Sequence, residues 1–163
     1  MFNLKLVNHI GRNVKIGENV KIWHFTYIGD QAEIGNDVTI GSLTHIDCGV
    51  KIGKSVKIEG SVYIPPLTDI GNNVFIGPGA VFTNDPYPPS SKLAGVTVKD
   101  GAVIGAHASI KSGVTIGAES VVAMGAVVIS DIPPRVVVAG NPAKKIYGVE
   151  TYYQKKKDWE SEL

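Results

Sequence analysis

Asn84, Asp85 and His107 are the residues whose types and placement best suit chemistry in this chain. Asn84 and Asp85 stand together in the stretch FTNDPYPP, and His107 is the histidine nearest to them in the sequence. An amide and a carboxylate can hold a reacting group and stabilise charge that develops on it, whereas histidine is the usual general base. Asn or Asp before Pro is also a common turn initiator, so a purely structural role for the pair is the alternative.

Two further pairs of side chains are candidates for ligand binding. Trp23 and His24 can line the mouth of a cleft, although aromatic packing on a neighbouring part of the fold explains them equally well. Lys144 and Lys145 carry ammonium groups that can pair with phosphates, and for them the alternative is plain solubility.

Composition restricts the kind of partner. The chain has 16 basic and 15 acidic side chains and a formal charge of +1, so it has no broad positive field for nucleic acid or an anionic membrane. No stretch approaches the roughly 20 apolar residues that span a bilayer, and the amino terminus lacks the apolar core of a secretory signal. We expect a cytoplasmic protein with a small ligand.

Histidine and cysteine usage argues against a metal site. The four histidines are dispersed at positions 9, 24, 45 and 107, so we expect no convergence of three imidazoles on one zinc ion. Cys48 is the only cysteine, which excludes an intrachain disulfide and a cysteine-based zinc cluster. We predict no bound metal, and we expect Cys48 to pack as a small hydrophobe.

These residues are set in a six-residue repeat. Isoleucine recurs at every sixth position from Ile10 to Ile76, and Phe82 takes the next place. A helix of period 3.6 cannot keep every sixth residue on one face. Three hexads instead form one 18-residue turn of a triangular parallel β-helix, with each aliphatic residue above the one 18 residues earlier. We expect an all-β rod whose aliphatic corners point inward.

The repeat is interrupted once. It stops after Phe82 and resumes at Val98, sixteen residues later, which is not a multiple of six. The intervening stretch contains three prolines that cannot donate to a strand ladder, so we predict an external loop over residues 83–97. A loop tolerated within so regular a rod favours a functional role.

The carboxy-terminal residues have a different pattern. We predict a β-helix domain over residues 1–147, followed by a C-terminal helix or tail over residues 148–163. Apolar groups among the charges there suit a short helix on the end or side of the rod, and a disordered tail is the alternative.

The hexads, the loop and the closing sequence VVVAGNPAKKI together resemble the hexapeptide-repeat acyltransferases over residues 8–147. The resemblance implies a left-handed β-helix, against the usual right-handed crossover. It also implies acetyl-CoA as the cosubstrate along the rod, and a homotrimer with active sites in clefts between subunits. Lys144 and Lys145 would then lie near the CoA groove, and Ala106 and Ala123 would leave room for the slim pantetheine arm.

Within that family, residues 22–25 (IWHF) and residues 73–88 (NVFIGPGAVFTNDPYP) look like enzymes that N-acetylate 3-amino sugars carried on a nucleoside diphosphate. In those enzymes the Asn and Asp of an F-x-N-D stretch approach the sugar around its amino group, which assigns that role here to Asn84 and Asp85. Pro66 is a departure, because these enzymes usually carry a carboxylate at its position. The identity of the sugar depends on that difference.

The loop also separates transfer to an amine from transfer to a hydroxyl. O-acetylating relatives carry a histidine in a T-x-T-H-P-like loop, and Asp85 stands in its place here. A carboxylate with a pKa near 4 is a weak base for an alcohol, whereas an amine is partly unprotonated at neutral pH and needs placement more than activation. We therefore predict an acetyl-CoA-dependent N-acetyltransferase in which the amine attacks the thioester directly.

Three alternatives remain at this point. An O-acetyltransferase would use His107 as its base. A zinc carbonic anhydrase of the same fold would need three imidazoles around one metal. A non-catalytic binding module is the third alternative, because a fold alone does not prove activity.

Overall fold

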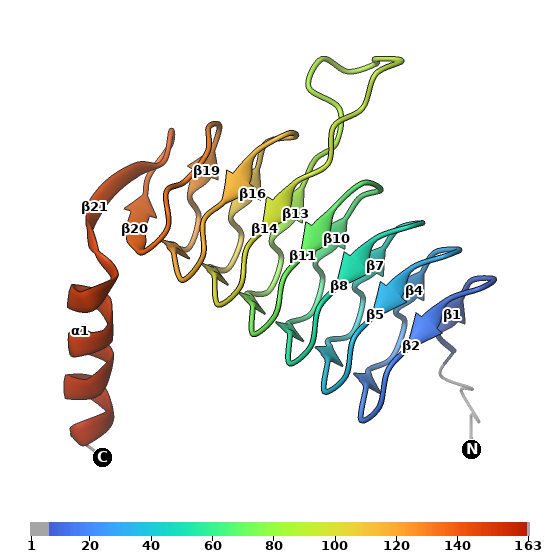
Figure 1. Cartoon of the computed structure of the whole chain (residues 1–163), viewed down its shortest axis with the longest axis horizontal. Coiled ribbons are helices and arrows are strands. Elements are labelled where there is room, and N and C mark those ends of the chain that lie inside the picture. The colour runs from blue at the N-terminus through green and yellow to red at the C-terminus, as the bar shows by residue number, and fades with distance from the viewer. Residues whose placement is uncertain (1–6, 163) are drawn as a thin grey trace, which may run out of the picture.

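The structure, a computed structural model, describes residues 7–162 and contains a long triangular rod (Figure 1). The first six residues of the predicted rod domain and the last residue of the predicted helix or tail lie outside the described residues. Each turn of the rod, called a coil below, contributes one short strand to each of three sheets, except that the last turn adds none to one of them. The expected β-helix built on the hexad is confirmed.

The strands are assigned to three sheets, named A, B and C. Sheet A contains β1 (His9–Ile10), β4 (Tyr27–Ile28), β7 (His45–Ile46), β10 (Tyr63–Ile64), β13 (Val81–Phe82), β16 (Ser109–Ile110) and β19 (Val127–Val128). Sheet B contains β2 (Lys15–Ile16), β5 (Glu33–Ile34), β8 (Lys51–Ile52), β11 (Asp69–Ile70), β14 (Thr97–Val98) and β17 (Thr115–Ile116). Sheet C contains β3 (Lys21–Ile22), β6 (Thr39–Ile40), β9 (Lys57–Ile58), β12 (Phe75–Ile76), β15 (Val103–Ile104), β18 (Val121–Val122), β20 (Val136–Ala139) and β21 (Lys144–Gly148).

The register follows the predicted 18-residue spacing. Ile10 pairs with Ile28 in sheet A, and the same step recurs along the rod. Across the loop, Ile70 pairs with Val98, 28 residues later, so ten extra residues leave the rod there. The loop projects from the turn between β13 and β14, in yellow-green in Figure 1.

The aliphatic residues face inward, but not at the corners. Each isoleucine of the repeat from Ile10 to Ile76 is the second residue of a strand and lies on a flat side of the triangle, and Ile40 and Ile58 are almost fully buried. The corners are the turns between strands, so the expected aliphatic corners are wrong. Gly41 shows why glycine so often opens a turn: a Cβ atom there would lie 2.5 Å from the backbone nitrogen of Gly60 in the next coil.

The two ends of the rod differ. Ile10 and Ile16 remain 42% and 43% exposed in the first coil. At the other end the antiparallel pair β20–β21 leads into helix α1 (Val149–Ser161), whose Val149 is buried with Val121 and Val137. The helix alternative is therefore confirmed over the described residues, and the tail alternative is wrong.

The outward residues of the strands make three different surfaces. Outer face A carries a row of rings, His9, Tyr27, His45 and Tyr63, whose successive centroids are 4.7, 4.4 and 5.4 Å apart. Outer face B carries charged residues, including an ion pair of Lys15 Nζ with Glu33 Oε1 at 2.8 Å. The C-terminal part of outer face C packs against Val149 and Tyr152 of α1.

Two observations bear on expectations from composition. Cys48 is exposed, so its expected packing as a small hydrophobe is wrong. Among residues 7–162, α1 is far too short and polar to cross a membrane.

Candidate functional site

The loop is anchored at its base by backbone contacts. Asn84 follows β13, and its carbonyl oxygen accepts a hydrogen bond from the backbone N–H of Ala94 at 2.8 Å. Gly95 brings the chain back against the rod, where a Cβ atom would lie 1.6 Å from the carbonyl oxygen of Leu67. Only glycine fits this return, and the hydrogen bond between Ala94 and Asn84 joins the two ends of the loop at its base.

The carboxylate of Asp85 organises the loop itself. Its Oδ1 accepts a hydrogen bond from the N–H of Tyr87 at 3.0 Å, and its Oδ2 accepts one from the N–H of Ser90 at 2.9 Å. This is the turn role that Asp before Pro often has. Each oxygen keeps a further lone pair, so the carboxylate can still accept a hydrogen bond from a ligand.

Thr83, the residue before Asn84, lines an open groove at the loop base. The groove has a volume of about 230 Å³ and is lined by Thr83, Ser109, Ile110, Lys111, Val127, Val128 and Ile129. The hydroxyl of Thr83 is hydrogen-bonded to the backbone of the next coil. It donates to the carbonyl of Ile110 at 3.1 Å and accepts from the N–H of Ser112 at 2.8 Å. The side-chain amide of Asn84 makes none of the hydrogen bonds found among residues 7–162, so it is available to a ligand.

His107 lies on a different edge of the rod from Asn84. Asn84 follows β13, whereas His107 precedes β16, the parallel strand that pairs with β13. The two residues are therefore at opposite ends of adjacent strands. We call the corner that holds Asn84 the A–B edge, and the corner that holds His107 the C–A edge, after the sheets that meet there.

The position of His107 is well defined. Its backbone N–H donates to the carbonyl of Pro78 at 2.9 Å. Its imidazole lies against the α-carbon of Gly79, because a Cβ atom on Gly79 would be 2.5 Å from Cε1 and 2.6 Å from Nδ1 of the ring. The side chain is exposed, so a ligand on the C–A edge can reach it.

The predicted cofactor residues gather towards the C-terminal end of the rod. Ala106 and Ala123 are half-buried on successive coils of the C–A edge, and Lys144 and Lys145 are exposed on β21, which pairs with the last strand of the rod. The carbonyl of Ala106 accepts from the N–H of Gly125 at 2.8 Å, and the N–H of Ala123 donates to the carbonyl of Val138 at 2.9 Å. Those two backbone groups are therefore already hydrogen-bonded within the rod.

Trp23 and His24 lie on the C–A edge near the other end of the rod. Their rings meet edge to face with centroids 6.5 Å apart, and the indole is 56% exposed. Trp23 borders a groove of about 370 Å³, lined also by Thr39, Gly41, Ser42, Lys57, Ile58, Glu59 and Gly60. The ion pair of Lys57 Nζ with Glu59 Oε1, at 2.8 Å, was not identified from the sequence.

The sequence does contain a signal for this groove. The first residue of the turn on the C–A edge is Gly41, Gly77 or Gly105 in three coils and the small Ala123 in another, but it is Trp23 and Glu59 in two of them. These exceptions are 36 residues apart, which is two coils, so they flank Gly41 on one edge.

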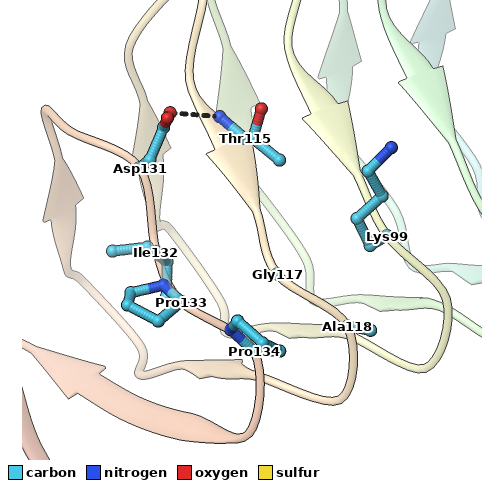
Figure 2. A pocket seen from close by; sticks show the side chains of 8 residues that line it. All are labelled: Lys99, Thr115, Gly117, Ala118, Asp131, Ile132, Pro133 and Pro134. Carbon is cyan, nitrogen blue, oxygen red and sulfur yellow. Dashed lines mark hydrogen bonds between the residues drawn. The ribbon is translucent and has the colours of Figure 1, made fainter.

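A further groove lies elsewhere, and none of the predicted site residues lines it. It has a volume of about 500 Å³ and is lined by Lys99, Thr115, Gly117, Ala118, Asp131, Ile132, Pro133 and Pro134 (Figure 2). Sheet B ends at β17, and there Asp131 Oδ1 accepts a hydrogen bond from the N–H of Thr115 at 2.7 Å. The hollow therefore follows from the way this sheet terminates.

The histidines are less dispersed in the fold than in the sequence. His9 and His45 are dispersed in sequence but lie two coils apart in one row, with the Tyr27 ring stacked between them. Among residues 7–162, no group of three histidine, cysteine or acidic side chains is arranged to hold a metal ion.

Comparison with known sequences identifies the repeat. The profile of the bacterial transferase hexapeptide family (six repeats) matches residues 9–48 and 49–84. A second profile, the hexapeptide repeat of succinyl-transferase, matches residues 31–66 and 93–130. The chain belongs to the hexapeptide-repeat acyltransferase family. The fold of this family member is a left-handed β-helix, as its resemblance to that family implied.

Curated relatives of this hexapeptide-repeat protein include two 2,3,4,5-tetrahydropyridine-2,6-dicarboxylate N-acetyltransferases. The protein from Alkaliphilus metalliredigens is 45% identical over 87 residues, and that from Brevibacillus brevis is 42% identical over 87 residues. Each match covers 53% of this chain and 36% of the relative. The chain therefore spans little more than a third of the length of the relatives it matches.

Two solved structures share the fold. A mutant of AntD, an N-acyltransferase from Bacillus cereus in complex with dTDP-4-amino-4,6-dideoxyglucose and coenzyme A, aligns with a TM-score of 0.78 at 20% identity. That alignment covers 94% of this chain and 93% of AntD. The acetyltransferase domain of PglB from Neisseria gonorrhoeae aligns with a TM-score of 0.54 at 22% identity, over 85% of this chain and 54% of that structure.

Proposed function

We propose that this chain is an acetyl-CoA-dependent N-acetyltransferase, located in the cytoplasm, that acylates an amino group of a nucleotide-linked amino sugar. The observation that carries the proposal is the loop on the A–B edge. Its base joins Asn84 directly to Thr83, which lines an open groove, and no histidine is among the residues that line that groove. This environment suits a nucleophile that needs placement more than deprotonation.

The chemistry follows from the two loop residues. The free amine of the sugar forms a C–N bond to the thioester carbonyl, and the C–S bond then breaks to release CoA. Positive charge develops on nitrogen in the tetrahedral intermediate, where the Asp85 carboxylate can accept an N–H hydrogen bond. Asn84 holds the amine or a neighbouring hydroxyl, and the nitrogen loses its proton to water or to the departing thiolate. No covalent acyl-enzyme is required.

The cosubstrate belongs on the C–A edge in this proposal. Ala106 and Ala123 are small and leave that edge slim enough for a pantetheine arm. Lys144 and Lys145 stand exposed at the same end of the rod, where ammonium groups can pair with CoA phosphates.

We include a homotrimer in the proposal because the A–B edge and the C–A edge of a single chain lie at different corners of the rod. Outer face A carries the stacked ring row and is flanked by exposed Phe25, Leu43 and Leu67, so it offers apolar surface for burial. Packing of three copies with this face towards a threefold axis would set the A–B edge of one copy beside the C–A edge of the next. The Asn84 loop would then approach the thioester held by a neighbour.

The test is release of free thiol from acetyl-CoA in the presence of nucleotide-linked amino sugars and, separately, hydroxyl acceptors. With an active amino sugar, Asn84→Ala and Asp85→Ala should each lower kcat/KM by about 10-fold or more, which is about 1.4 kcal/mol of transition-state stabilisation. The melting temperature should hardly change, because these bonds are local to the loop. His107→Asn is the matched control and should keep most of the activity.

One alternative has a specific observation in its favour. His107 is exposed on the C–A edge beside Ala106, so it can serve as general base for a hydroxyl acceptor. A dead His107→Asn variant together with an active Asp85→Ala variant would make the O-acetyltransferase the better assignment.

A further inference from the structure

The groove beside Trp23 combines three features that suit a planar ring. Its aromatic wall is the 56% exposed indole of Trp23, its floor includes Gly41, and the ion pair of Lys57 and Glu59 lies on the other side of Gly41. Trp23 and Glu59 are two coils apart, which is about 10 Å at the usual spacing of parallel strands. A flat ring stacked on the indole fits within that width.

The two walls are exceptions to the repeat. Gly41 occupies its turn position because a Cβ atom there would meet the next coil, yet Trp23 and Glu59 take the equivalent position in the neighbouring coils. A large exposed aromatic residue at a position that four other coils give to glycine or alanine is a local departure without an evident gain in packing. Such departures are expected at functional sites.

The polar wall is prearranged for hydrogen bonding. Lys57 Nζ is held by Glu59 at 2.8 Å and also lies 5.8 Å from the centroid of the Phe75 ring. The pair therefore presents an ammonium donor beside a carboxylate acceptor. A nucleobase edge offers the complement, since each base carries a hydrogen-bond acceptor next to an N–H donor.

The distance between the groove and the Asn84 loop favours a nucleotide over a free sugar as the ligand. Gly41 is three coils from the coil that carries the Asn84 loop, which is about 14 Å along the rod. In the proposed trimer, where the A–B edge of one copy lies beside the C–A edge of the next, a nucleoside diphosphate has the reach to link a base at the groove to a sugar at the neighbouring copy's loop. A monosaccharide stacked on Trp23 could not reach Asn84 as well.

We propose that this groove is the nucleobase subsite, in which the base stacks on Trp23 and its edge pairs with Lys57 and Glu59. The inference rests on the proposed function for the identity of the ligand, because it assigns the groove to the nucleotide part of the same substrate. It adds Lys57 and Glu59 as specificity residues, and it predicts binding of the nucleotide even without an amino sugar.

The experiment uses the two tryptophans of the chain, Trp23 and Trp159. In the Trp159→Phe protein, Trp23 is the only indole, so titration with UDP, dTDP, GDP, CDP and ADP reports directly on stacking. At least one nucleotide should quench the fluorescence saturably. By calorimetry, Trp23→Ala should weaken that nucleotide by about 10-fold or more, and Trp23→Phe should retain most of the affinity.

Two controls make the result specific. Trp159→Ala removes the 68% exposed indole of α1 and should leave the affinity unchanged. Glu59→Gln should weaken binding or change the order of preference among the five nucleotides. Equal affinity in Trp23→Ala and the parent protein, or quenching by ribose 5-phosphate as strong as by the nucleotide, would overturn the subsite.

The outcome is separable from the proposed function. Asn84→Ala should lose transfer while keeping the nucleotide affinity. Nucleotide binding that depends on Trp23, without transfer to any amino sugar, would sink the proposed function and leave the subsite standing. Active transfer together with a nucleotide affinity that does not change in Trp23→Ala would support the proposed function and rule out the subsite.

Discussion

Outer face B alternates in charge along the rod, whereas outer face A stacks aromatic rings at the same position of the hexad. Lys15, Glu33, Lys51 and Asp69 follow one another on face B, each paired in register with the next. His9, Tyr27, His45 and Tyr63 do the same on face A. Both faces enclose the same isoleucine core.

The difference shows that the two residues of each strand have separate tasks. The inward residue is dictated by burial and determines the fold, and the outward residue is free to vary with the use of the surface. Alternating charges suit a face in water, where cross-strand pairs give modest support. A row of half-exposed rings suits a face that another copy can cover.

The largest effect is expected from the shared interior. Ile40→Asp should abolish the folded state, because an unpaired carboxylate would enter a dry core at a residue with no exposed area. Circular dichroism should show no cooperative melting. Thr39→Asp, on the outward side of the same strand, should still melt cooperatively. Melting of the Ile40→Asp protein like that of the parent would mean that the inward register is wrong.

The next effect should separate the two faces. Tyr63→Asp places a carboxylate at the end of the ring row on face A, against His45 and close to Asp47, and is expected to convert the proposed trimer into monomers that remain folded. Lys51→Gln, on face B, should leave the trimer intact. Sedimentation equilibrium at micromolar concentration distinguishes these states. A stable trimer of the Tyr63→Asp protein would remove face A as the interface.

The smallest effect concerns the charges of face B. The hydrogen bond and ion pair with Lys15 hold the pKa of Glu33 below its ordinary value of 4.5. A carboxyl with a lowered pKa in the folded state adds stability above its unfolded pKa, and loses that contribution as the pH falls through its folded pKa. Both groups are exposed, so the contribution should be small.

Melting curves of Glu33→Gln and the parent protein test this sign. The variant should melt slightly lower at pH 7, and the difference should fade below pH 4.5. A difference that grows on acidification would contradict the assignment. Lys15→Gln should give the same pattern, because it removes the partner that lowers the Glu33 pKa.

Much of this architecture follows from the sequence alone. A six-residue aliphatic period is incompatible with a helix and, at 18 residues per coil, places Ile10 above or below Ile28 whatever the outward residues are. The break in period at Phe82 determined that a loop leaves the rod, since a step of sixteen cannot continue the hexad. The resemblance to hexapeptide-repeat acyltransferases supplied the handedness, which periodicity does not contain.

Tertiary structure decided how the chemical groups are distributed over the rod. Parallel pairing of β13 with β16 puts Asn84 and His107 at opposite ends of adjacent strands, although His107 is the histidine nearest to Asn84 in the sequence. Stacking of coils put Trp23 and Glu59 on either side of Gly41, and it left Cys48 on an exposed turn. The physical reason is that a period tells which residues face inward, whereas the contacts of outward side chains depend on the edge that each coil turn occupies and on the backbone passing in the next coil.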